Sequence, residues 1–210
     1  MLLNVKKGIC IFTLMCLPGL SFADEYEPGV NYTVVSDSVN SKDTVTEYFS
    51  VYCGHCYAME LQGIPMLKKA LRDDITLEQT PVNFMGFVSE SSQNLMAKAF
   101  MAARDKEKGD AFLDLVFPQF HREKIDKPIA ALAQVLDIDE ADALDLVQDE
   151  EINKRFLKEV DAQNELLKRG LRGTPSFIVN GKYLVNMEEL DNKAPFKDLV
   201  SLIKYLNGLV

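Results

Sequence analysis

The sequence predicts an α/β domain that is interrupted by a helical insertion. Segments rich in β-branched and aromatic residues, which favour strands, lie within the first 86 residues and again from residue 171 onward. Between them, residues 87–170 carry apolar side chains at helical spacing. This helical stretch is longer than a single crossover between parallel strands. We therefore expect residues 24–86 and 171–210 to form one α/β unit around an inserted helical domain of residues 87–170.

Residues 1–23 have the pattern of a removable export signal. Two lysines precede an apolar run from Ile9 to Leu20, and small residues precede the expected cut. The run is shorter than the ~20 residues that a membrane-spanning helix needs. An uncleaved anchor or a lipoprotein signal is the alternative, but Met15 before Cys16 is not the small residue usual in lipoprotein signals. We expect cleavage after Ala23 and an exported protein.

The net charge narrows the class of partner. The chain has 210 residues and a formal charge of −9 at pH 7, and loss of the two signal lysines makes the remainder more negative. Such a surface repels nucleic acid and anionic membranes, so we expect neither as a partner. The length suits one domain with an insertion and a substantial core.

The cysteine count changes when the signal is removed. Cys10 and Cys16 would leave with it, and Cys53 and Cys56 would remain. A zinc site usually needs four ligands, and His121 lies in a distant segment. A structural disulfide across so short a loop would add little stability. We therefore favour a redox-active pair, with no metal and no bound cofactor.

Four elements are expected before the insertion. Strands are predicted at Tyr32–Val35, Thr44–Val51 and Ile75–Phe84, where β-branched and aromatic residues are frequent. Apolar residues recur at helical spacing over Tyr57–Arg72, which predicts a helix. Pro65 lies inside this helix and should kink it.

Several helices and a hairpin are expected afterwards. Ser89 can cap the first helix of the insertion, and Gly170 can end the last one. Helical spacing recurs near residues 95–103, 112–116, 128–136, 140–147 and 152–167. Asn180-Gly181 lies between two apolar segments, which is the strongest short hairpin signal. An amphipathic helix is expected over residues 196–206.

The position of the cysteine pair favours a reactive thiolate. Cys53 follows a predicted strand and precedes a predicted helix, where free backbone N–H groups and the helix dipole stabilise negative charge. A protonated His55 would add to this effect. Stabilising the thiolate stabilises the reduced form, so the Cys53–Cys56 disulfide would be oxidising.

Four segments carry a family resemblance. They are the run from Glu47 to Tyr57 around the cysteines, then Val82–Gly86, Gly173-Thr174-Pro175 and Val179–Tyr183. In this order they resemble the DsbA family of periplasmic dithiol oxidases. The resemblance implies a thioredoxin fold interrupted by an inserted helical domain. It also implies disulfide donation to exported cysteine-containing proteins, with reoxidation by an inner-membrane, quinone-linked partner resembling DsbB.

The resemblance also implies roles for individual residues. Cys53 would be the exposed sulfur that is attacked, and Cys56 its buried partner in the redox-active disulfide. Pro175 would be cis, and the loop of Thr174 and Pro175 would hold the substrate backbone.

Two acidic residues near the pair have competing interpretations. Glu47 lies in an otherwise apolar strand, and the resemblance makes it a proton relay for Cys56. Alternation along the strand could instead point it to solvent. Glu60, one helical turn after Cys56, could share the relay role, although a solvated helix residue is the more ordinary interpretation.

Three positions depart from the usual family pattern. Gly54 precedes His55 where a proline is typical, Thr174 replaces a valine, and Gln79 occupies the place of a lysine. Because Gly54 and Thr174 resemble residues of disulfide isomerases, a disulfide isomerase or reductase of the same fold is the alternative function. Those isomerases usually carry a dimerisation domain. We find no such segment before Tyr32 and expect a monomer.

A non-enzymatic holdase or binding module with an idle cysteine pair is a further alternative. Full function in a variant that lacks both cysteines would favour it. The sequence assigns no function to His121.

Overall fold

The fold is built on one five-stranded mixed sheet. The computed structural model describes residues 26–208, so the expected signal at 1–23 lies outside the described part. The strands are β1 (Tyr32–Val34), β2 (Thr44–Phe49), β3 (Thr76–Pro81), β4 (Ser176–Val179) and β5 (Tyr183–Val185). Their order across the sheet is β1-β5-β4-β2-β3, and β2 and β3 form its parallel pair.

Three loops meet at one edge of this sheet. Because β2 and β3 are parallel, with Phe49 opposite Pro81, the segments that follow both strands leave from the same edge. β4 is antiparallel to β2, and Tyr48 pairs with Ser176, so β4 begins at that edge as well. Residues that follow β2, follow β3 and precede β4 are therefore brought together from distant parts of the sequence.

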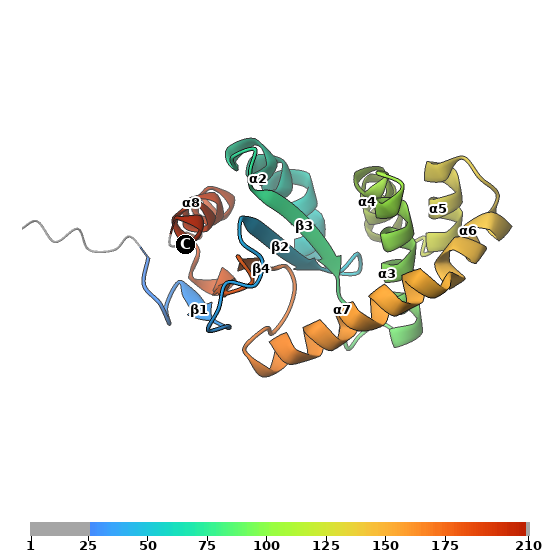
Figure 1. The fold of residues 1–210 in the computed structure, drawn as a ribbon. Helices are drawn as coiled ribbons and strands as arrows, with labels where there is room; N and C mark the ends of the chain where they lie inside the picture. The colour runs from blue at the N-terminus through green and yellow to red at the C-terminus, as the bar shows by residue number, and fades with distance from the viewer. Residues whose placement is uncertain (1–25, 209–210) are drawn as a thin grey trace, which may run out of the picture.

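Helices cover both faces of the sheet. Helices α2 (Ile64–Ala70) and α8 (Pro195–Asn207) lie on one face. Their apolar side chains share a core with β2, β4 and β5. Helix α1 (Gly54–Ala58) precedes α2 in the chain, and its buried Cys56 belongs to the core of the insertion. On the other face, Ile178 and Leu184 pack with Leu166 and Leu167 from the end of α7 (Glu150–Lys168). Figure 1 shows α7 returning the chain from the insertion to the sheet.

The insertion is a helical body beside the sheet. It contains α3 (Glu90–Asp105), α4 (Gly109–Pro118), α5 (Pro128–Leu136), α6 (Glu140–Gln148) and α7, and Figure 1 shows α3 to α6 grouped together. Its core is continuous with the segment around the cysteines, because Phe49 of β2 packs edge-on against Phe100 of α3 with ring centroids 5.4 Å apart. Among residues 26–208, no helix combines the length and apolar character needed to cross a bilayer.

Short sequence motifs correctly predicted several ends of helices and strands. Ser89 caps α3 by accepting a hydrogen bond from the backbone N–H of Ser92, as predicted. The Asn180-Gly181 hairpin is confirmed: both residues have positive φ, 57° and 64°, and Lys182 N–H closes the turn on the carbonyl of Val179 at 3.0 Å. Gly170 follows the end of α7 with φ of 120°.

The predicted helix over Tyr57–Arg72 differs in detail. It is divided into α1, a π-helical turn at Met59–Gly63 and α2, and Pro65 lies in the first turn of α2. Proline cannot donate to the carbonyl four residues earlier, here that of Leu61, and the wider π turn lies at that position. The third strand is also shorter than predicted. It ends at Pro81, which has no backbone N–H to donate, and β3 is the outermost strand of the sheet, where a proline is tolerated.

Candidate active site

The cysteine pair lies where β2 gives way to α1. After Phe49 the chain turns through Ser50, whose carbonyl accepts a 3.0 Å hydrogen bond from the N–H of Cys53. Cys53 is the N-cap of α1 and Cys56 lies within that helix. Both cysteines are free thiols in this structure. The strand-to-helix placement predicted from sequence is thus confirmed.

Cys53 has the properties of an acidic thiol. Its Sγ lies 3.3 Å from the carbonyl oxygen of Thr174, and 8% of the residue is exposed. A hydrogen bond from the Cys56 thiol, followed by contributions from Thr174 and the backbone N–H groups of Cys56 and His55, lowers the pKa of Cys53 to about 5. The prediction of an exposed Cys53 is wrong for this structure, in which the residue is buried, although less completely than Cys56.

Cys56 has the opposite character. It is 1% exposed, and burial raises the pKa of its thiol far above the ordinary value, with a further increase from Cys53. The N–H of Ser50 lies 3.5 Å from its Sγ. At neutral pH the pair therefore carries its negative charge on Cys53.

His55 contributes to the site through its backbone. The residue is exposed on α1, and its backbone N–H is among the groups that lower the pKa of Cys53. The expected stabilisation of the thiolate by free N–H groups at the helix start is therefore confirmed. The additional effect of a protonated His55 ring stays a prediction.

The loop before β4 forms the second wall of the site. The Thr174–Pro175 bond is cis, as predicted. Ser176 Oγ donates to the carbonyl of Gly173 at 2.8 Å, and Thr174 Oγ1 lies 3.6 Å from Met85 Sδ in the loop after β3. Beside this loop lies a cavity of about 770 Å³, bordered among others by His55, Thr174 and Pro175.

The side-chain amide of Gln79 bridges two acidic side chains, those of Glu47 and Glu60. Glu47 is 1% exposed and shares the buried face of β2 with Val45 and Phe49, so the solvent-facing alternative is wrong. Gln79 Nε2 donates to Glu47 Oε2 at 2.9 Å and to Glu60 Oε2 at 2.8 Å. Burial raises the pKa of Glu47 to about 8 and also raises that of Glu60.

Sequence reasoning missed two residues that fix the segment before Cys53. His121 Nε2 lies 2.8 Å from the carbonyl oxygen of Val51, and its ring stacks on Tyr57 with centroids 5.1 Å apart. Tyr52 Oη donates to Asp126 at 3.3 Å. Both contacts join segments about 70 residues apart, and no local pattern in the sequence marks them.

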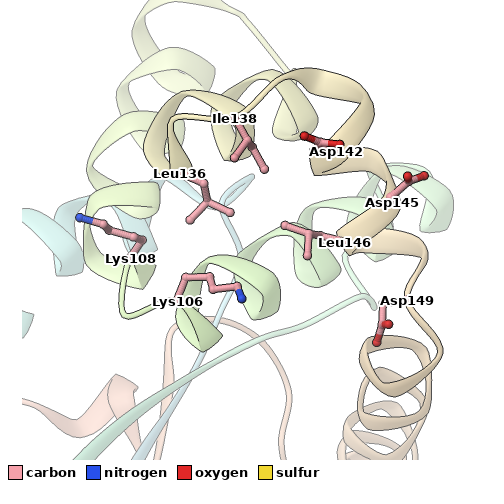
Figure 2. A pocket seen from close by; sticks show the side chains of 8 residues that line it. All are labelled: Lys106, Lys108, Leu136, Ile138, Asp142, Asp145, Leu146 and Asp149. Atoms are coloured by element: carbon pink, nitrogen blue, oxygen red, sulfur yellow. The ribbon is translucent and has the colours of Figure 1, made fainter.

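A second cavity, of about 680 Å³, lies in the helical insertion, away from the cysteines. Figure 2 shows its lining: Lys106, Lys108, Leu136, Ile138, Asp142, Asp145, Leu146 and Asp149. Lysines face aspartates across apolar side chains there. In the part of the chain that the structure describes, no group of three or more His, Cys, Asp or Glu residues is placed to hold a metal ion.

Comparison with known proteins agrees with this geometry. Residues 44–195 match the DSBA-like thioredoxin domain family. The thiol:disulfide interchange protein DsbA of Haemophilus influenzae is 30% identical over 201 residues, which cover 95% of each chain. That of Escherichia coli K12 is 28% identical over 195 residues, 88% of this chain and 90% of the relative. A crystal structure of DsbA from Klebsiella pneumoniae, 25% identical, has a TM-score of 0.73 and covers 89% of this chain and 100% of that one.

The family and the interrupted thioredoxin fold predicted from the four sequence segments are therefore confirmed. The relatives are matched over nearly their whole length, and the order of strands and helices is that of an α/β domain with helices inserted between β3 and β4. The chain belongs to the DSBA-like thioredoxin domain family, and it is a protein thiol–disulfide oxidoreductase of the disulfide-donating type.

Proposed function

We propose that Cys53 and Cys56 form the disulfide that this enzyme donates. A substrate thiolate attacks Cys53 Sγ, so that a substrate–Cys53 bond forms and the Cys53–Cys56 bond breaks. A second substrate thiolate then attacks the substrate sulfur of the mixed disulfide, and Cys53 leaves as a thiolate. The substrate loses two electrons and gains a disulfide, and the enzyme is left reduced, with a thiolate at Cys53 and a thiol at Cys56.

Glu47 supplies the proton that Cys56 needs. When the Cys53–Cys56 bond breaks, Cys56 leaves with the bonding electron pair inside a buried site, where a thiolate is costly. With a pKa of about 8, Glu47 is largely protonated at neutral pH and can give up its proton. Glu60, joined to Glu47 through Gln79, offers a second carboxyl nearer to solvent.

The Thr174–Pro175 loop and the adjacent cavity position the substrate. Thr174 already places its carbonyl 3.3 Å from Cys53 Sγ, so an extended chain lying along this loop would bring its cysteine to the reactive sulfur. The substrates are cysteine-containing exported proteins. The enzyme works in the periplasm after loss of residues 1–23, as a monomer without a bound cofactor, and is reoxidised by a DsbB-like, quinone-linked membrane protein.

One observation carries this proposal: the pKa of Cys53 is lowered, whereas the pKa of Cys56 is raised. The pKa of Cys53 falls to about 5, so the reduced enzyme holds a stable thiolate and Cys53 is a good leaving group. Both effects favour release of a disulfide to the substrate over retention of it.

The test is the reduction potential of the cysteine pair, measured by equilibration with glutathione. Each ~30 mV corresponds to tenfold in the exchange equilibrium. We expect a value well above that of the glutathione couple and no turnover in the Cys53→Ser variant. A value near or below that couple would favour the isomerase or reductase alternative, which Gly54 and Thr174 suggest. Retained oxidase activity in Cys53→Ser would contradict the mechanism.

A further inference from the structure

A β-turn carries the chain from β2 to the reactive cysteine. It runs from Ser50 to Cys53 and is closed by the 3.0 Å hydrogen bond from Cys53 N–H to the carbonyl of Ser50. Its two central residues, Val51 and Tyr52, are buried. The turn also contacts the second cysteine, because the N–H of Ser50 lies 3.5 Å from Cys56 Sγ. The shape of this turn therefore decides how both sulfurs lie relative to the strand.

The central peptide of the turn, between Val51 and Tyr52, is held at both ends. Its N–H donates to Ser50 Oγ at 3.2 Å, and its carbonyl oxygen lies 2.8 Å from His121 Nε2. Turns of types I and II differ mainly by a rotation of this peptide, which reverses the direction of its carbonyl. Because both of its polar groups are bound, the peptide is kept in one orientation. Of the two partners, His121 belongs to the helical insertion.

The imidazole ring of His121 is itself held in place by aromatic side chains. It stacks on Tyr57 with ring centroids 5.1 Å apart and an interplanar angle of 10°. Phe120 packs against it edge-on, also at 5.1 Å. The ring lies in the π-helical turn Gln119–Glu123, and such turns are frequent at functional sites. The ring cannot turn away from the carbonyl of Val51 without losing these contacts.

The contact requires a proton on Nε2 of His121. A carbonyl oxygen only accepts hydrogen bonds, so the ring donates, either as the neutral Nε2–H tautomer or as imidazolium. The hydrogen bond is therefore compatible with both charge states of the ring. It also satisfies a backbone carbonyl in a buried turn, where an unpaired polar group is costly.

The turn sets how Cys53 meets the start of α1. Cys53 is both the last residue of the turn and the N-cap of that helix. Its sulfur is in contact with the carbonyl of Thr174 and is stabilised as a thiolate by backbone N–H groups of the helix start. Rotation of the peptide two residues earlier would displace Cys53 and weaken these contacts.

We infer that His121 is a positioning residue for Cys53: by holding the carbonyl of Val51, it keeps the reactive sulfur aligned with the N–H groups at the start of α1. This inference rests on the proposed function, in which Cys53 is the attacked sulfur. It gives the helical insertion a part in the chemistry of the cysteine pair.

The variant His121→Phe tests the inference, because it keeps a ring against Tyr57 and removes the donor. We expect the midpoint pH for alkylation of Cys53 to rise by about one unit. At pH 7 the equilibrium with glutathione should shift about tenfold toward the oxidised protein, since a weaker thiolate stabilises the reduced form less. His121→Gln, which keeps a side-chain N–H donor, should restore most of both values.

Ile152→Val is the matched control for a general loss of stability. Ile152 is buried in the same core of the insertion, and loss of one methyl group costs about as much unfolding free energy as one hydrogen bond. This variant should leave the midpoint and the equilibrium unchanged. Wild-type values in His121→Phe would overturn the inference, as would equal shifts in Ile152→Val or a His121→Gln variant that behaves like His121→Phe.

A measurement on the wild-type protein needs no variant to fold. With nitrogen-15 in its histidine rings, NMR at pH 8 should find the proton of His121 on Nε2 and protected from exchange with water. A ring that carries its proton on Nδ1 alone would overturn the inference. Failure of the wild-type protein to oxidise peptide dithiols would contradict the proposed function, and the alkylation midpoints would still decide the role of His121.

Discussion

Gln79 donates a 2.9 Å hydrogen bond to the carboxyl of Glu47, whose side chain lies in the interior beside the central strands. A neutral amide is thus a direct partner of this buried acid, and a second acid, Glu60, shares the same amide. Burial outweighs this hydrogen bond and raises the pKa of Glu47 to about 8.

Replacing Glu47 with Gln should change how stability depends on pH. Because the pKa of Glu47 is raised from 4.5 to about 8 on folding, the folded state holds its proton more tightly. The stability that Glu47 contributes is therefore greatest below pH 4.5 and falls as pH rises toward 8, by an amount on the order of 4 kcal/mol. Denaturant unfolding at several pH values should show this fall in the parent and its loss in Glu47→Gln.

The measurement should be made in a Cys53→Ser background. The lowered pKa of Cys53 contributes stability of the opposite sign, which rises between pH 5 and 9 and would mask the effect. Glu165→Gln is a suitable control because Glu165 is exposed on α7. A Glu47→Gln variant that keeps the full fall would show that another group titrates in this range.

Replacing Gln79 with Leu should raise the pKa of Glu47 further. The amide hydrogen bond is the principal influence that lowers this pKa, and leucine fills a similar volume without a donor. Carbon-13 NMR titration of the glutamate carboxyls should find the Glu47 midpoint above 8. An unchanged or lower midpoint would mean that Gln79 does not set the proton affinity of Glu47.

Alkylation of the reduced protein should follow the thiolate of Cys53. Because only the thiolate reacts, labelling by iodoacetamide should rise with pH through a midpoint near 5, while Cys56 stays unlabelled at neutral pH. Cys56→Ala removes the hydrogen bond that lowers this pKa most, so its midpoint should move upward. Cys56→Ser, which keeps a donor, should move it less. Equal midpoints in both variants would refute this assignment.

Changes at His121 should separate its hydrogen bond from its stacking. His121→Phe keeps the ring against Tyr57 but leaves the carbonyl of Val51 without this partner, which should cost about 1 kcal/mol of unfolding free energy. His121→Ala loses both contacts and should cost about 2–3 kcal/mol. Denaturant midpoints at pH 8 provide the measurement, and equal stability of the two variants would mean that stacking contributes nothing.

The parts of this structure that the sequence could predict depend on neighbouring residues. Asn180-Gly181 defines its turn through its own backbone preferences, and Ser89 caps the helix that follows it. The cysteines lie at a helix start because the strand and helix patterns meet there. Such features need no knowledge of the rest of the chain.

The parts that it could not predict depend on partners far along the chain. Gln79 reaches Glu47 from a neighbouring strand, and His121 reaches Val51 from the insertion, 70 residues away. Side chains alternate between the two faces of a strand, so the sequence alone could not tell whether Glu47 points to the core or to solvent. The packing of helices on the sheet decides which face is buried. Each of these contacts follows from tertiary structure and leaves no periodic signal.

The position of β4 in the middle of the sheet also bears on how the protein matures. β4 joins β2 to β5, yet it is made only after the whole helical insertion. A chain made from its amino-terminal end therefore contains both cysteines well before the strand and the Thr174–Pro175 loop that complete their surroundings. Until then, Cys53 lacks the contact with Thr174 that helps to make its thiol acidic in the finished fold.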